Sequence, residues 1–166
     1  MIEIIIQAPS AYTRHTLEPT EPAPPPAQNT TEATTPAPKR KQLAVDTLVR
    51  ALLLLPQSAR PKPVWLEMRG TLSPLESWGS YRGYYECIAL DPTHNPLRSA
   101  VTVQDLINSL RGAVGSKMQG YKGGEYTIDW STRVYVSPYG EASGLMAVGV
   151  LEASGHVVIE TEPEDD

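Results

Sequence analysis

The stretch T-V-Q-D-L-I-N-S-L-R-G-A-V-G, from Thr102 to Gly115, decides the fold class of this chain. Thr102 followed three residues later by Asp105 is an N-terminal capping pattern, in which each side chain bonds the backbone N–H of the other residue. Gly112 and Gly115 offer an end to the helix. The apolar residues recur every three or four positions and form one stripe, made of Val103, Leu106, Ile107, Leu110 and Val114. The sequence therefore predicts an amphipathic helix between segments that resemble strands.

A second helix is expected upstream, over residues 39–55. It contains good helix formers and leucines near a helical period, and Pro56 stops it. The basic run from Lys39 to Lys41 is expected to be the solvated start of this helix, and a nucleic-acid signal is the less favoured interpretation. We expect both helices to cover one core.

The rest of the chain has β character. Strands are expected at 63–68, 83–90, 126–128, 134–137, 145–151 and 156–161, with a polar, turn-rich stretch from Arg69 to Gly79. The segments D-W-S-T and E-A-S-G are expected to be hairpin loops. Apart from a loose echo between two tyrosine motifs, no internal repeat is evident. The pattern predicts an α+β fold: a mainly antiparallel sheet of about five to six strands with two helices packed on one face.

Composition divides the chain into four parts. Residues 1–7 are β-branched and form an expected N-terminal strand, and residues 8–38 are a Pro/Thr/Ala-rich linker that is expected to be disordered. Residues 39–162 are the single α+β domain, and residues 163–166 are an acidic tail with a solvated end. The N-terminal strand is expected to join the sheet of the domain or, as a less favoured alternative, to pair with another chain and make a homo-oligomer. A frayed terminus is the third alternative.

Charge and cysteine content narrow the function classes. The chain of 166 residues has a formal charge of −5 with only 14 Lys and Arg, which argues against broad binding to duplex nucleic acid. Small anionic ligands need only one or two well-placed cations. Cys87 is the sole cysteine, so a reducing compartment is the simplest expectation. The N-terminus lacks a basic signal region and no apolar run is long enough to span a membrane, so we expect an intracellular protein without a membrane partner.

The first candidate motif is E-S-W-G-S-Y-R-G-Y-Y-E, residues 76–86. Trp78, Tyr81 and Tyr84 supply aromatic faces, and Arg82 supplies a guanidinium. Rings stack on nucleobases, and a guanidinium binds phosphate through paired charged hydrogen bonds. The structural alternative is that the rings plug the edge of the sheet and Arg82 pairs with a nearby glutamate.

The second motif is G-Y-K-G-G-E-Y, residues 120–126. Its glycines permit positive φ angles and close approach of the backbone to a ligand, and Lys122 adds a cation. The spacing is that of neither a Walker A loop nor a dinucleotide fingerprint. A tight turn between helix and strand also explains Gly123 and Gly124, but it does not need Tyr121, Lys122 and Glu125 together.

A third stretch, S-P-Y-G-E at residues 137–141, repeats the same residue types with Tyr139 and Glu141. If the three strands concerned are neighbours, their loops converge into one pocket. The histidines are scattered, and the glutamates lack a metal-binding spacing, so a binding role fits the residue types better than catalysis. We expect neither a cofactor nor a metal.

The motifs S-Y-R-G-Y-Y, T-V-x-[DE]-L, G-Y-K-G-G-E-Y and V-Y-V-S-x-Y-G-E, in this order, resemble a group of small uncharacterised proteins encoded by tailed bacteriophages. The resemblance covers about residues 74–150 and implies a setting, the cytoplasm of an infected host, rather than a mechanism. Such a setting suggests a protein that sequesters an anionic nucleotide-type ligand, such as an immune second messenger. The alternatives are a phosphodiesterase that degrades such a ligand and a protein-interaction module tethered by residues 1–38.

Overall fold

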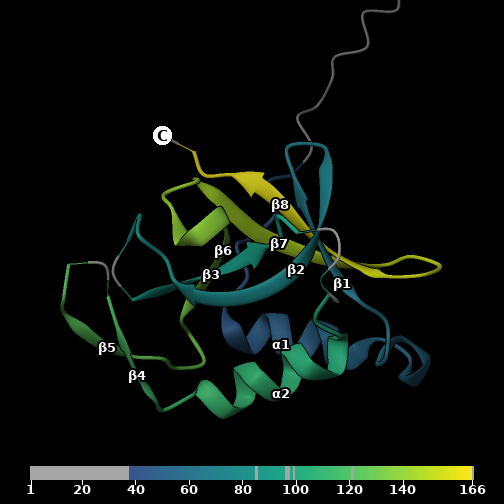
Figure 1. Ribbon diagram of the computed structural model, residues 1–166, viewed down its shortest axis with the longest axis horizontal. Coiled ribbons are helices and arrows are strands. Elements are labelled where there is room, and N and C mark those ends of the chain that lie inside the picture. The colour runs from purple at the N-terminus through teal and green to yellow at the C-terminus, as the bar shows by residue number, and fades with distance from the viewer. Residues whose placement is uncertain (1–37, 85, 96–97, 99, 121, 166) are drawn as a thin grey trace, which may run out of the picture. The chain divides into compact units, whose positions relative to one another are not determined.

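The computed structural model describes residues 38–165 except 85, 96–97, 99 and 121, and these belong to one compact unit. The expected strand at 1–7 lies outside the described residues, as does the expected linker apart from Pro38. The elements are labelled in Figure 1 and have these bounds: α1 Val45–Leu54, η1 Gln57–Ala59, β1 Val64–Met68, β2 Thr71–Ser80, β3 Cys87–Pro92, α2 Val103–Ala113, β4 Lys117–Gln119, β5 Glu125–Thr127, β6 Arg133–Val136, η2 Pro138–Gly140, β7 Leu145–Glu152 and β8 Val157–Pro163.

The fold is α+β, as predicted, with two helices and one mixed sheet of six strands. Four neighbouring pairs are antiparallel, but β3 with β6 and β8 with β1 are parallel. The parallel β8–β1 pair closes the sheet into a barrel in the order β1-β2-β3-β6-β7-β8, and β4 and β5 form a separate hairpin. Closure was not predicted, because it depends on pairing between strands at opposite ends of the domain.

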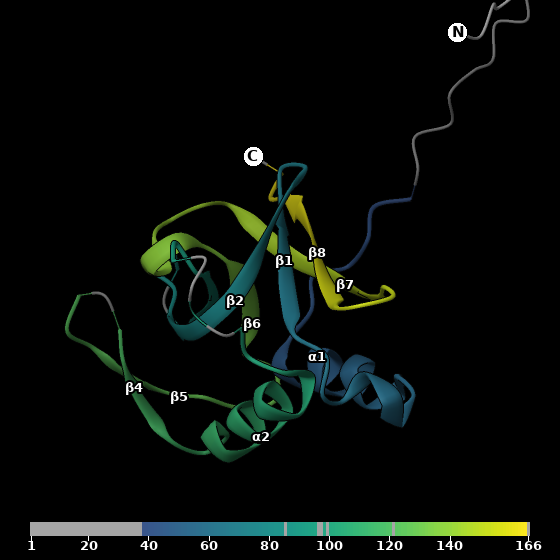
Figure 2. The ribbon, with the colours of Figure 1, turned by 45° about the vertical axis from the view of Figure 1, so that its right-hand side comes forward.

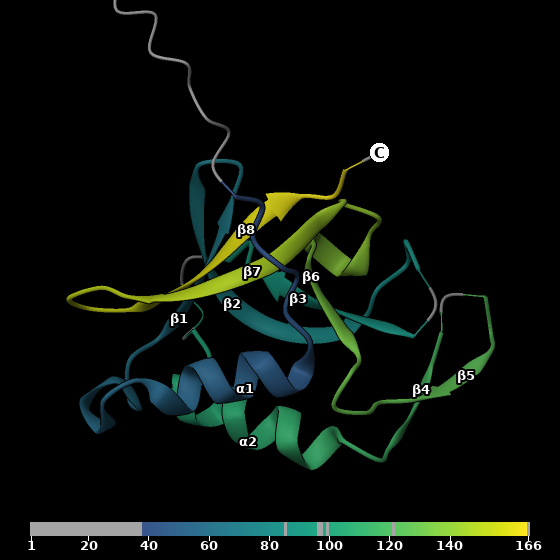
Figure 3. The ribbon, with the colours of Figure 1, turned by 180° about the vertical axis from the view of Figure 1, so that it is seen from behind.

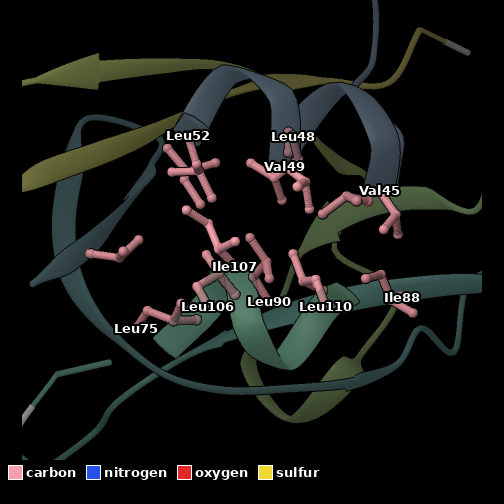
Figure 4. Packing of buried hydrophobic residues seen from close by; sticks show 14 of the residues in the cluster. Val45, Leu48, Val49, Leu52, Leu75, Ile88, Leu90, Leu106, Ile107 and Leu110 are labelled. Atoms are coloured by element: carbon pink, nitrogen blue, oxygen red, sulfur yellow. The ribbon is translucent and has the colours of Figure 1, made fainter. Parts of the chain in front are cut away.

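The two helices lie side by side beneath the barrel (Figures 2 and 3). Their apolar stripes belong to the same buried cluster as the inward-facing residues of the strands, such as Val64, Leu75 and Ile159. Figure 4 shows the stripes of α1 and α2 facing each other, with Ile88 and Leu90 from β3 beside them. The capping pattern is confirmed: Asp105 N donates to Thr102 Oγ1 over 3.2 Å.

One arrangement of helix and strands occurs twice in the structure, although no such repeat was evident in the sequence. A helix followed by a three-stranded meander occurs as α1-β1-β2-β3 and again as α2-β6-β7-β8. Each central strand has a register shift, between Leu75 and Ser77 in β2 and between Ala147 and Gly149 in β7. The buried helix positions also correspond, as Val45 with Val103, Leu48 with Leu106, Val49 with Ile107 and Leu52 with Leu110.

The first turn of each helix is hydrogen-bonded to the residue or two before the first strand of the other half. Val45 N donates to Thr132 O over 2.9 Å, just before β6, and Val103 N donates to Lys62 O over 3.0 Å, just before β1. Because the two attachments exchange partners, neither half has its complete set of contacts alone. The repeat is carried by apolar positions and backbone geometry rather than by identical residues, which is why the sequence hides it.

Several expected boundaries were wrong. The stretch from Arg69 to Gly79 was expected to be turn-rich, yet most of it is β2, whose Pro74 faces Trp65 of β1. Its Ser, Pro and Glu residues disfavour a strand, so pairing on both sides decides it. The strand expected from residue 83 begins only at Cys87 and runs on to Pro92. The first helix begins at Val45, because the chain before it bonds to the barrel instead: Leu43 N donates to Ala147 O, and Leu43 O accepts from Val134 N.

The expected D-W-S-T hairpin is also wrong. β5 pairs with β4, and β6 pairs with β3 in parallel. Asp129 instead turns the chain into the barrel, because its carboxylate accepts hydrogen bonds from Ser131 N over 2.8 Å and from Ser131 Oγ over 2.7 Å. These hydrogen bonds, the Ser131 hydroxyl first, lower the pKa of Asp129, although burial acts to raise it. β4 was missed because Lys, Met and Gln are weak strand formers. The predicted β7–β8 hairpin is confirmed.

The basic run and the acidic end, both expected to be solvated, pair with each other. Arg40 contacts Glu160 through Nη1 at 2.6 Å and Glu162 through Nε at 2.8 Å, and Lys39 pairs with Asp165. These exposed pairs are individually weak. Together they place residues 39 and 40 beside β8.

Glu67 closes the turn between β1 and β2. Burial works to raise the pKa of its carboxyl group, but hydrogen bonds from Gly70 N at 2.7 Å and from the backbone and hydroxyl of Thr161 at 3.2 Å hold that pKa below its ordinary value. The carboxylate form is therefore favoured in the folded state.

Candidate functional site

Two connections of the second half are longer than their counterparts in the first, and both pass beside β2. Where β1 and β2 are joined by the turn Arg69-Gly70, β6 and β7 are joined through η2. Where α1 leads through the short η1 to β1, α2 leads through the β4–β5 hairpin to β6. Together with the β2–β3 loop at residues 81–86, these connections border two adjoining cavities, which we call the trough.

The larger cavity of the trough has a volume of about 490 Å³. Its aromatic residues are Trp78 on β2 and Tyr139 on η2, and Arg82 lies on its wall. Polar groups come from Asp91 and Gln119. The remaining lining residues are Ser77, Gly79, Ser80, Ala89 and Gly140. Aromatic surface with a few convergent polar groups is typical of a small-molecule site.

The smaller cavity has a volume of about 280 Å³ and lies between the β2–β3 loop and the β4–β5 hairpin. It is lined by Ser80, Tyr81, Arg82, Gly83, Tyr84, Gly120 and Lys122. Ser80 and Arg82 therefore belong to both cavities. Arg82, from the first motif, therefore shares the smaller cavity with Lys122 of the second motif and the larger cavity with Tyr139 of the third.

Glycine at position 140 allows η2 to lie directly against β2. Gly140 has a φ of +68°, and a Cβ there would lie 2.5 Å from Ser80 O. Its own carbonyl accepts a hydrogen bond from Arg82 N over 2.7 Å. This close approach sets the distance between η2 and the β2–β3 loop, and so the width of the larger cavity.

Tyr139 is held in an unusual conformation at the mouth of the larger cavity. Its φ is +52°, its N–H donates to Asp91 Oδ1 over 2.9 Å, and its ring stacks on His94 with centroids 5.0 Å apart. The side chain is nevertheless 64% exposed. Positive φ at a bulky residue is strained, and such strain is concentrated at functional loops.

Tyr81 anchors the β2–β3 loop rather than presenting a free ring. It is buried and stacks on Tyr135 with centroids 4.0 Å apart and an angle of 6°. Its hydroxyl accepts a hydrogen bond from Gly144 N over 2.9 Å. Gly83 is required here, because a Cβ would lie within 2.8 Å of three atoms of the Tyr81 side chain.

Burial is the main cause of two pKa shifts beneath this loop. It raises the pKa of Tyr135, whose hydroxyl donates to Glu164 Oε1 over 3.1 Å, and that of the Cys87 thiol. Tyr84, above them, is half exposed, and the guanidinium carbon of Arg133 lies 5.5 Å from its ring centroid. Tyr84 thus keeps exposed surface at the smaller cavity, while Tyr81 supports it.

Tyr126 fastens the β4–β5 hairpin to the barrel. Its hydroxyl donates to Cys87 O over 2.9 Å, and burial raises the pKa of that hydroxyl. Within the hairpin, Gly123 has a φ of +84° and Gly124 O accepts from Gly120 N over 2.6 Å. This tight turn places Lys122 at the smaller cavity.

Of the predicted site residues, Trp78, Tyr81, Arg82, Tyr84, Lys122 and Tyr139 line the trough. Tyr121 lies outside the described residues. Gly123 and Gly124 shape the hairpin without lining either cavity. Glu125 pairs with Lys117 over 3.3 Å, and Glu141 lines neither cavity. Asp91, Gln119 and Gly140 line the larger cavity without having been predicted, and of these only Gly140, in a Tyr-Gly turn, carried a recognisable signal.

A third cavity of about 470 Å³ continues from the larger one along β2 toward α2. The two share Ser77 and Trp78, and Trp78 Nε1 donates to Ser109 Oγ of α2 over 2.8 Å. Its wall is mainly apolar, with Leu75, Val101 and Leu106.

Among the described residues, no three His, Cys, Asp or Glu side chains are grouped so that they could hold a metal ion. Neither α1 nor α2 has the length and apolar character that crossing a bilayer requires. Comparison of the chain with protein-family models, curated proteins and solved structures finds no match.

Proposed function

We propose that this protein binds a small anionic nucleotide-type ligand in the trough. The proposal rests on the observation that cations and aromatic residues line the same cavities. Arg82 and Lys122 line the smaller cavity, and Arg82 lines the larger one with Tyr139 and Trp78. A nucleotide needs both a charge partner for phosphate and a face for its base. The trough offers both within one continuous surface.

The surroundings favour binding of an anion at this position in an otherwise acidic protein. The formal charge of the chain is −5, yet among the described residues the smaller cavity is lined by Arg82 and Lys122 without an acidic side chain, and Asp91 lines only the larger cavity. Glu125, the acidic residue nearest to Lys122 in sequence, is paired with Lys117 instead. The guanidinium of Arg82 can form paired hydrogen bonds with phosphate oxygens.

The resemblance to tailed-phage proteins suggests what such binding would achieve. A small protein that holds a nucleotide without transforming it would lower the free concentration of a nucleotide signal in an infected cell. This role is part of the proposal and rests on the resemblance, whereas the binding itself rests on the trough.

Calorimetric titration with a panel of adenine and guanine mononucleotides and dinucleotides tests the proposal. Arg82→Gln combined with Lys122→Gln should weaken binding about 10- to 150-fold or more, because a hydrogen bond to a charged group contributes roughly 1.5–3 kcal/mol. The matched control is Arg50→Gln with Lys41→Gln, which removes two exposed cations that line neither cavity. The ligand recovered after denaturation should be unaltered.

The proposal fails if no member of the panel binds at about 1 mM, which is the weak end of specific affinities. It also fails if the control pair weakens binding as much as the trough pair does, because binding would then reflect net charge alone. Thermal unfolding of each variant verifies that the fold is intact.

A further inference from the structure

The trough is divided into two compartments with a cation at the division. Ser80 and Arg82 line both cavities, the larger lying toward η2 and the smaller toward the β4–β5 hairpin. Ligand sites usually have volumes of roughly 300–1,000 Å³. The smaller cavity, at about 280 Å³, falls just below this range alone, but the two together lie well within it.

Each compartment has its own aromatic residue. Tyr139 and Trp78 serve the larger one, and Tyr84 serves the smaller one with 48% of its surface exposed. The polar groups differ as well. Asp91 and Gln119, which can pair with the edge of a ring, line only the larger cavity, while Lys122 lines only the smaller.

The backbone fixes the division between the compartments. Arg82 N is bonded to Gly140 O over 2.7 Å, and Tyr81, the residue before it, is buried and stacked on Tyr135. The backbone is therefore held at Arg82 itself and at the residue before it. A cation at the boundary between two aromatic compartments matches a molecule with phosphate between two nucleosides.

From this arrangement, and resting on the proposed function, we infer that the ligand is a dinucleotide, with one base in each compartment and the linking phosphate at Arg82. A mononucleotide occupies only one compartment and leaves the second aromatic surface unused. The two compartments are chemically unlike, so the two bases are held in different environments. Stacking of the second base strengthens binding by roughly 5- to 150-fold.

The test compares AMP with a 3′–5′-linked diadenylate and with cyclic diadenylate, and the same three guanine compounds, by calorimetric titration of the full chain. We expect at least one dinucleotide to bind at least tenfold more tightly than its mononucleotide. Tyr84→Ala should remove most of that advantage, measured as the ratio of dinucleotide to mononucleotide affinity, because Tyr84 lines only the smaller compartment.

Trp130→Ala is the matched control, since Trp130 is 45% exposed and lines neither compartment. It should leave the dinucleotide advantage unchanged. Equal affinity for mononucleotides and dinucleotides would overturn this inference and leave the proposed function standing. Absence of binding by all six compounds would overturn both. Unfolding curves of the Tyr84→Ala protein separate a lost compartment from a lost fold.

Discussion

Replacing Gly140 by alanine tests how the trough is held open. Gly140 has a φ of +68°, where an alanine costs roughly 1–2 kcal/mol relative to glycine. The new Cβ would also lie 2.5 Å from Ser80 O, whereas real contacts of this kind stay at 3.0 Å or more. Since Ser80 O is backbone, η2 and β2 must separate by about 0.5 Å, the difference between these two distances.

Forced separation of packed segments costs a further 1–3 kcal/mol or so. We therefore expect Gly140→Ala to lower the free energy of unfolding by about 2–5 kcal/mol in total. Gly144→Ala is the matched control: Gly144 has a φ of +64°, but a Cβ there meets nothing within 4 Å. It should lose only the backbone contribution of about 1–2 kcal/mol.

Urea unfolding followed by circular dichroism measures both variants, and the difference between them isolates the contact with Ser80. A difference of about 1–3 kcal/mol is expected. Equal losses, within roughly 0.5 kcal/mol, would refute the argument that the close approach of η2 to β2 is sterically tight. Any nucleotide affinity should fall more in Gly140→Ala than in Gly144→Ala, because only the first moves the wall of the larger cavity.

The remaining predictions concern the repeat, the hairpin and acid stability. Leu48→Ala and Leu106→Ala remove corresponding buried residues of the two helices. Each should lower the free energy of unfolding by about 2–5 kcal/mol, with similar values for the two. A negligible effect at one of them would contradict the equivalence of the halves. Tyr126→Phe should lower the free energy of unfolding by about 1 kcal/mol and should speed amide exchange mainly in β4 and β5. Uniform acceleration across the domain would show that Tyr126 does not hold the hairpin specifically. Glu67→Gln should destabilise at neutral pH, because a carboxyl group with a lowered folded-state pKa contributes stability above its unfolded pKa. The effect should fade as the pH falls below the ordinary glutamate range and through the lower folded-state pKa. A pH-independent effect in urea titrations would exclude this linkage.

Local sequence patterns were reliable where short-range physics decides the structure. The Thr102 and Asp105 cap and the spacing of the apolar residues after it fixed α2, since both act within a few residues. The β7–β8 hairpin followed from two apolar runs and a glycine-ended loop. β2 was missed, because its polar composition disfavours a strand and only its neighbours β1 and β3 make it one.

The candidate site was predicted in part for the same reason. Arg82, Lys122 and Tyr139 were singled out by residue type, and that choice required no tertiary information. Asp91 and Gln119 could not be found, because nothing in their surrounding sequence distinguishes them. Glu125 and Glu141 resembled site residues by composition, but Glu125 pairs with Lys117 and Glu141 lines neither cavity.

The helix stripes, the β7–β8 hairpin and the residue types available to a ligand could be predicted from local patterns, because periodicity, capping and turn chemistry act over a few residues. The tertiary structure alone decided the closure of the barrel, the exchanged attachments of the two halves and the meeting of three loops along β2. Those features depend on backbone pairing between segments far apart in the chain, such as β8 with β1, and on one close contact between Gly140 and Ser80. Pairing of this kind leaves no mark in any single stretch of sequence.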